Sequence, residues 1–100
     1  MFPRAGGLSA PKPADKKIQE ICDSVKHQAE KKSGKNYAHF KADSYATQTV
    51  AGTNYIIKVQ VNGNEYVHLH VFEGLQCNGG HLELKSMQGS KTKQDPIVLF

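Results

Sequence analysis

The sequence predicts an α+β domain in which one long helix packs across an antiparallel sheet of four to five strands. Three observations support this fold class: helical spacing of apolar residues in one early stretch, period-two patterns after Gly34, and short polar turns between the strand-like runs. Since no strand–helix–strand unit occurs, the sheet should be antiparallel, with the helix covering one of its faces. A length of 100 residues suits a single domain spanning 1–100.

The predicted helix runs from Ala14 to about Lys32. Its start is marked by Pro13 and by Asp15, which is either the N-cap or a first-turn acid, and its end by Lys31-Lys32 followed by Ser33-Gly34. One apolar stripe recurs at spacings of three and four, formed by Ile18, Ile21, Cys22, Val25 and Ala29.

The residues before the helix, 1–13, contain Pro3, Pro11, Pro13 and the Gly6-Gly7 pair, with few side chains suited to a core. Proline and glycine favour extended or irregular backbone, and chain ends are commonly poorly ordered. We therefore expect a flexible, extended arm.

Period-two patterns predict strands over residues 37–42, 55–61, 66–72 and 81–87. Asn62-Gly63 between the second and third runs predicts a tight primed hairpin turn, because both residue types tolerate positive φ. In the third run one face should carry Val67, Leu69 and Val71, and the other Tyr66, His68, His70 and Phe72. A glycine-containing loop at 74–80 precedes the fourth run, and the sequence finishes with the apolar residues 97–100.

Composition narrows the class of protein. No apolar run is long enough to cross a membrane, and the start of the sequence lacks the apolar segment of a secretory signal, so we expect a cytoplasmic location without membrane association. Two cysteines allow at most one disulfide, which favours reduced thiols. The net charge of +4 leaves a basic nucleic-acid-binding module as an alternative, although the scattered lysines favour an ordinary solvated surface and no nucleic-acid partner.

Histidines and cysteines suggest a further alternative, a metal-dependent enzyme using His68, His70 and His81. Without a nearby acid or thiol motif we expect neither a metal nor another cofactor, and no enzymatic activity. Cys22 belongs to the apolar stripe and should be a packed thiol, whereas Cys77 in a polar loop should be exposed.

The segment Gln48-Thr49-Val50-Ala51-Gly52 would by itself indicate only a hairpin turn between two strands. The longer run to Val59, however, resembles the central hairpin of the stefins, a branch of the cystatin superfamily. The resemblance extends over essentially the whole sequence, through Gly6-Gly7-Leu8-Ser9, Lys12-Pro13-Ala14, His68-Leu69-His70-Val71-Phe72 and the terminal Phe100.

The resemblance implies a cystatin-like fold and reversible, tight-binding inhibition of papain-like cysteine proteases such as cathepsins. It implies three protease contacts: an N-terminal trunk with Gly6 and Gly7, a first hairpin loop with Gln48, Thr49, Val50, Ala51 and Gly52, and a second loop with Leu75 and Gln76. Of the two glycines, Gly6 is favoured as the family's key trunk residue. Gln76 stands where stefins commonly have proline, so the second loop should be more mobile and contribute less.

Such an inhibitor performs no chemistry and should act mainly as a monomer. A hairpin joining two long strands could also open and exchange between two copies, which would give a domain-swapped dimer as a secondary state.

Overall fold

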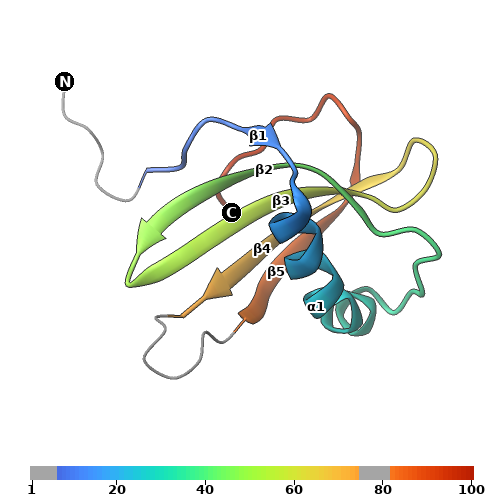
Figure 1. Ribbon diagram of the computed structural model, residues 1–100. Coiled ribbons are helices and arrows are strands. Elements are labelled where there is room, and N and C mark those ends of the chain that lie inside the picture. The colour runs from blue at the N-terminus through green and yellow to red at the C-terminus, as the bar shows by residue number, and fades with distance from the viewer. Residues whose placement is uncertain (1–6, 75–81) are drawn as a thin grey trace.

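The computed structural model describes residues 7–74 and 82–100, and it shows one helix against a five-stranded antiparallel sheet (Figure 1). The predicted fold class is therefore confirmed. The strands lie in chain order, β1-β2-β3-β4-β5, and each neighbouring pair is antiparallel. The elements are β1 (Lys12–Pro13), α1 (Lys16–Ser33), β2 (Lys41–Val50), β3 (Gly52–Gln60), β4 (Tyr66–Glu73) and β5 (Leu82–Lys91).

Helix α1 begins two residues after the predicted start at Ala14, and it ends at Ser33, close to the predicted end at about Lys32. Asp15 is the N-cap, and its Oδ1 accepts a hydrogen bond from the backbone N–H of Ile18 at 3.0 Å. Gly34 closes the other end in the left-handed conformation, at φ 72°, and its N–H donates to the Glu30 carbonyl at 2.8 Å. Within the described ranges no helix is both long and apolar enough to cross a membrane.

The main hydrophobic core lies between α1 and the sheet. The predicted stripe of α1 is buried, and it packs with inward residues of the central strands, Tyr55, Ile57, Val59, Val67, Leu69 and Val71. Cys22 is fully buried in this core, and burial raises the pKa of its thiol to about 12. The prediction of a packed thiol is confirmed for Cys22, while Cys77 lies outside the described residues.

The strand predicted over residues 37–42 is wrong for its first four residues, because β2 begins only at Lys41. Tyr37 and Phe40 both turn into the core from a loop, and their rings stack with centroids 5.6 Å apart. Gln19 holds the end of this loop: its Nε2 donates to the Phe40 carbonyl at 2.9 Å, and its Oε1 accepts from the N–H of Ala42 at 2.9 Å. These side-chain hydrogen bonds replace the ladder that a strand would have formed.

The β3–β4 connection forms the predicted hairpin but not the predicted turn. The backbone N–H groups of Val61 and Asn62 both donate to the Glu65 carbonyl, at 3.0 and 3.3 Å, so the loop is wider than a two-residue turn. In the described parts of the chain positive φ occurs at Gly34, Gly52 and Ser90, and so not at Asn62 or Gly63. A wider loop removes the need for the left-handed backbone that a primed turn demands.

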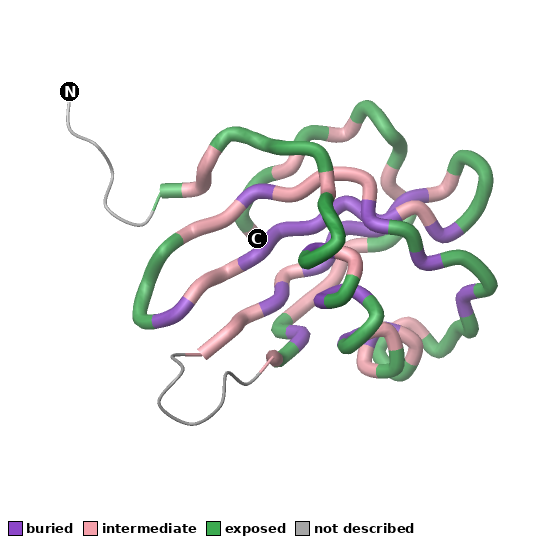
Figure 2. The backbone as a smooth tube through the Cα atoms, viewed as in Figure 1, coloured by how far each residue is buried: buried purple, intermediate pink, exposed green. Residues whose placement is uncertain are grey.

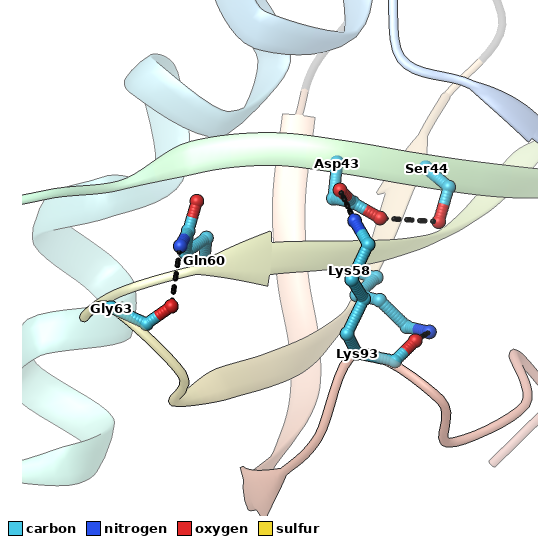
Figure 3. Close-up of polar contacts among 6 residues, drawn as sticks. All are labelled: Asp43, Ser44, Lys58, Gln60, Gly63 and Lys93. Atoms are coloured by element: carbon cyan, nitrogen blue, oxygen red, sulfur yellow. Dashed lines mark hydrogen bonds and ion pairs between the residues drawn. The ribbon is translucent and has the colours of Figure 1, made fainter.

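The face of the sheet opposite α1 is covered by the segment that follows β5, residues 92–100. The Lys58 ammonium donates to the carbonyl of Lys93, and the Lys93 ammonium lies 3.0 Å from Asp43 Oδ1 (Figure 3). Beneath this segment Ile56, Lys58 and His68 are buried, at 0%, 6% and 0% exposure. Successive residues of β3 and β4 are therefore buried, whichever face of the sheet they are on (Figure 2).

Candidate functional site

The segment Gln48–Gly52 forms the β2–β3 hairpin, with a tighter turn than the sequence predicts. Gln48 pairs with Asn54, Thr49 with Thr53, and Val50 with Gly52, so Ala51 alone stands between the strands. Thr49, Val50 and Ala51 are exposed, Val50 at 43%. The hairpin thus presents a small, partly apolar tip on a fully paired two-stranded ribbon.

Two features of the structure require glycine at position 52. Its φ is 121°, a backbone conformation that residues with a side chain rarely adopt. A Cβ at this position would also lie 2.5 Å from the backbone oxygen of Glu73 and 2.8 Å from Cζ of Phe72. The hairpin therefore fits against the end of β4 only because position 52 has no side chain.

Tyr55 fixes the same end of β4 from the helix side. Its hydroxyl donates to Glu73 Oε1 at 3.0 Å, and the Lys17 ammonium lies 6.0 Å from the centre of its ring. Burial and the hydrogen bond to Glu73 raise the pKa of Tyr55, so the phenol stays a donor. Helix α1, the hairpin and the last residue of β4 are thereby held together.

A chain of side-chain hydrogen bonds crosses the other face of the sheet from the hairpin. Asn54 Nδ2 donates to Gln48 Oε1 at 2.8 Å, and Asn54 Oδ1 lies 3.0 Å from Nε2 of His70. The other ring nitrogen of His70 lies 2.9 Å from the carbonyl oxygen of Phe100. Sequence reasoning missed this Gln48–Asn54–His70–Phe100 chain, although the hairpin register could have placed Asn54 opposite Gln48.

The N-terminal segment lies along the outer edge of β2. Ser9 donates its N–H to the Thr47 carbonyl at 2.8 Å and accepts the Thr47 N–H on its Oγ at 3.0 Å. Lys12 and Pro13 then pair with Tyr45 and Ser44 as β1. These contacts hold the second half of the predicted arm against β2, whereas the flexibility expected for residues 1–13 stays a prediction.

The β2–β3 hairpin, the end of β4 and the start of β5 lie at one end of the sheet (Figure 1). Because the N-terminal segment is antiparallel to β2, the exposed Gly7 lies toward the hairpin tip. The end of β4 and the start of β5 lie beside the hairpin, since Glu73 pairs with both Thr53 and Leu82. Gly6, Leu75 and Gln76 fall outside the described residues.

The histidine alternative finds no support in the described ranges, where no three His, Cys, Asp or Glu side chains are grouped to hold a metal. His68 and His70 do share a strand face, as predicted, but His70 is hydrogen-bonded to Asn54 and Phe100. His68 is buried, with both ring nitrogens lacking a partner among the described residues. His81 lies outside those residues.

Comparison with known proteins identifies the class of protein to which this fold and hairpin belong. A family model described as the cystatin domain matches residues 6–94, and the chain therefore belongs to the cystatin family.

The relatives narrow that class. The chain is 56% identical to a protein named cystatin-B from Oplegnathus fasciatus, over 95% of each sequence. It is 50% identical to leukocyte cysteine proteinase inhibitor 1 of Sus scrofa, over 96% of this chain and 93% of the relative. It is 47% identical to human cystatin-A, over 95% of this chain and 97% of the relative. This similarity to cystatins A and B shows that the chain is a stefin-type cystatin.

Proposed function

We propose that this protein is a reversible, tight-binding inhibitor of papain-like cysteine proteases such as cathepsins. The observation that carries the proposal is that Gly7, the exposed hairpin tip and the strand ends that flank the Leu75-Gln76 loop all lie at one end of the sheet. The name of the Sus scrofa relative, a cysteine proteinase inhibitor, supports the same reading.

The proposed mechanism is occlusion of the protease cleft without cleavage. Val50 and Ala51 enter the groove as a small apolar tip, while Gln48 and Thr49 offer polar contacts beside it. The hairpin is already paired up to Val50 and Gly52, so little conformational freedom is lost on binding. Gly6 and Gly7 let the trunk backbone approach the groove closely, and Leu75 with Gln76 forms the third contact.

The proposal is tested by titrating papain with the protein and measuring residual hydrolysis of a small peptide substrate. Stoichiometric loss of activity is expected, and full activity at micromolar excess of the protein would contradict the proposal.

A matched pair of variants tests whether the hairpin tip contacts the protease. Ala51→Asp should weaken inhibition about 100-fold, because it buries an unpaired charge in the cleft.

The matched control for this test is Ala38→Asp. Ala38 is also an exposed alanine, but it lies in the loop before β2, at the start of the strand whose other end carries the hairpin tip. This variant should inhibit like the unmodified protein. Equal inhibition by both variants would remove the hairpin from the interface.

The trunk is tested by deleting residues 1–7. This should weaken inhibition mainly through faster dissociation, because affinity differences between related complexes lie mostly in that rate. Stopped-flow association and displacement measurements separate the two rates. An unchanged dissociation rate would refute a role for the trunk.

The monomer is the proposed active form, located in the cytoplasm, where Cys22 stays a buried free thiol. If the β2–β3 hairpin opens on mild heating, two copies exchange strands and the Ala51 turn is lost. Chromatography after heating, with inhibition assayed on each peak, should then show an inactive dimer beside an active monomer. A fully inhibitory dimer would contradict opening at this hairpin.

A further inference from the structure

We propose that Ser9 is a positioning residue for the N-terminal trunk, and that its hydroxyl fixes Gly7 beside the β2–β3 hairpin before a protease binds. This role rests on the proposed function, because Ser9 prepares one of the proposed protease contacts. The trunk here means residues 1–7, of which the structure describes Gly7. Two hydrogen bonds between Ser9 and Thr47 of β2 carry the proposal.

Ser9 meets β2 out of register with β1. In β1, Lys12 pairs with Tyr45, and the same antiparallel register would place Ala10 opposite Thr47. Ser9 takes that place instead, and its N–H donates to the Thr47 carbonyl at 2.8 Å. The acceptor for the Thr47 N–H is then the Ser9 Oγ, at 3.0 Å, and not a backbone carbonyl. A side chain therefore completes the pairing where the backbone register shifts.

The Ser9 hydroxyl serves as acceptor and donor at once. Its Oγ accepts from Thr47, and its O–H donates to the Ala10 carbonyl at 3.1 Å. A side chain without a hydroxyl at position 9 would leave the Thr47 N–H without this acceptor. Because Thr47 is only half-buried, water can replace the hydroxyl there, so the fold itself should lose little. The loss falls on the attachment of the trunk to the hairpin.

This attachment lies close to both Gly7 and the hairpin tip. Two residues of chain span at most about 7 Å, so Gly7 stays within that distance of Ser9. Thr47 lies three residues before the exposed Val50, and it pairs across the ribbon with Tyr55, which is buried. The trunk is therefore tied to a well-packed part of the hairpin, and the position of Gly7 relative to the tip is set in the free protein.

A trunk that is placed in advance costs less conformational freedom on binding. If the hydroxyl of Ser9 is removed, the residues before β1 keep the Ser9 N–H bond to Thr47 but lose the second one. The protease must then order Gly7 at the expense of affinity. Loss of one hydrogen bond of this kind corresponds to a change of about fivefold in an equilibrium constant.

The first test needs no protease. Ser9→Thr and Ser9→Val have side chains of nearly the same shape, and only threonine keeps the hydroxyl. Hydrogen exchange of the Thr47 amide should be about fivefold faster in Ser9→Val than in Ser9→Thr. The ¹⁵N heteronuclear NOE of Gly7 should fall in Ser9→Val alone. Equal exchange rates and equal NOE values in the two variants would overturn the proposal.

The second test determines whether the hydroxyl acts through the trunk. Inhibition constants for papain are measured for Ser9→Thr and Ser9→Val, each with and without residues 1–7. In the full-length chain the constant for Ser9→Val should be about fivefold higher than that for Ser9→Thr. In the chains that lack residues 1–7 the two constants should be equal. The same ratio in both backgrounds would mean that Ser9 does not act through the trunk, and would overturn the proposal.

Ser24 provides the matched control, since it is exposed on α1 and its hydroxyl donates to the Glu20 carbonyl at 2.9 Å. Ser24→Thr and Ser24→Val should inhibit papain equally in both backgrounds. If papain is inhibited but the two Ser9 variants inhibit equally in the full-length chain, the proposal for Ser9 fails alone. If the unmodified protein does not inhibit papain, the proposed function fails, while the NMR comparison still decides whether the Ser9 hydroxyl positions Gly7.

Discussion

The two faces of the sheet are built by different means. The face toward α1 is apolar and is closed by a regular helix whose buried stripe packs on β3 and β4. The opposite face mixes Ile56 with Lys58, His68 and His70, and it is closed by residues 92–100, which form no helix or strand. The helix face therefore supplies the main core, while the other face carries the polar contacts that extend to the hairpin.

The largest expected effect compares two neighbouring isoleucines, both at 0% exposure and on opposite faces of β3. Ile57→Ala should reduce the free energy of unfolding by about 4 kcal/mol, because the rigid packing of α1 leaves a cavity, whereas Ile56→Ala should cost about 2 kcal/mol. The irregular segment 92–100 can settle into the space that Ile56 leaves. Urea denaturation measures both losses, and equal values would remove this distinction between the faces.

The second effect is acid sensitivity of the face opposite α1. Burial, and then the charges of Lys58 and Lys91, lower the pKa of His68 to about 4 from an ordinary 6.5. Between these values the unfolded chain binds more protons than the folded one, so the free energy of unfolding falls as pH falls through that window. The total loss should be about 3 kcal/mol once pH reaches about 4.

Urea denaturation at a series of pH values tests this loss. His68→Leu should remove the His68 contribution to the slope, whereas the exposed His27→Leu should leave it in place. An unmodified protein and a His68→Leu variant with the same pH dependence would show that His68 is not the group responsible.

The smallest expected effect on stability is at the contact between Gln19 of α1 and the loop that leads into β2. Gln19→Ala removes the hydrogen bonds to the Phe40 carbonyl and from the Ala42 N–H, and should cost about 1 to 2 kcal/mol. Gln94→Ala, at an exposed position, should be neutral by comparison. Hydrogen exchange of the Ala42 amide should also accelerate in Gln19→Ala, and an unchanged rate would argue against this role of Gln19.

Local patterns predicted the helix face well and the opposite face poorly. The stripe of α1, the cap at Asp15 and the inward set Val67, Leu69 and Val71 follow from spacing and residue type alone. The loop at 37–40 was mistaken for a strand because a Gln19 side chain, distant in sequence, takes its hydrogen bonds. Likewise, nothing local shows that residues 92–100 fold back over Lys58 and His68.

The sequence indicated which residues belong to the candidate site but not how they are arranged in space. The family resemblance named Gln48–Gly52, yet the pairing that continues to Val50 and Gly52 depends on strand register. The contact of Gly52 with Glu73 needs the third strand in place, and the His70 chain needs the covering segment. The last two are contacts between residues far apart in sequence, which periodicity cannot report.

The collision that any side chain at Gly52 would meet has an evolutionary consequence. Thr49, Val50 and Ala51 are exposed, so under the proposed function they can change to suit another protease without disturbing the sheet. Gly52 is closed to such change by its φ of 121° and by the Glu73 oxygen. Under the proposed function, the residues that set the target and the residue that the fold requires are therefore neighbours in one hairpin, and an engineered library should vary the first three while keeping the fourth.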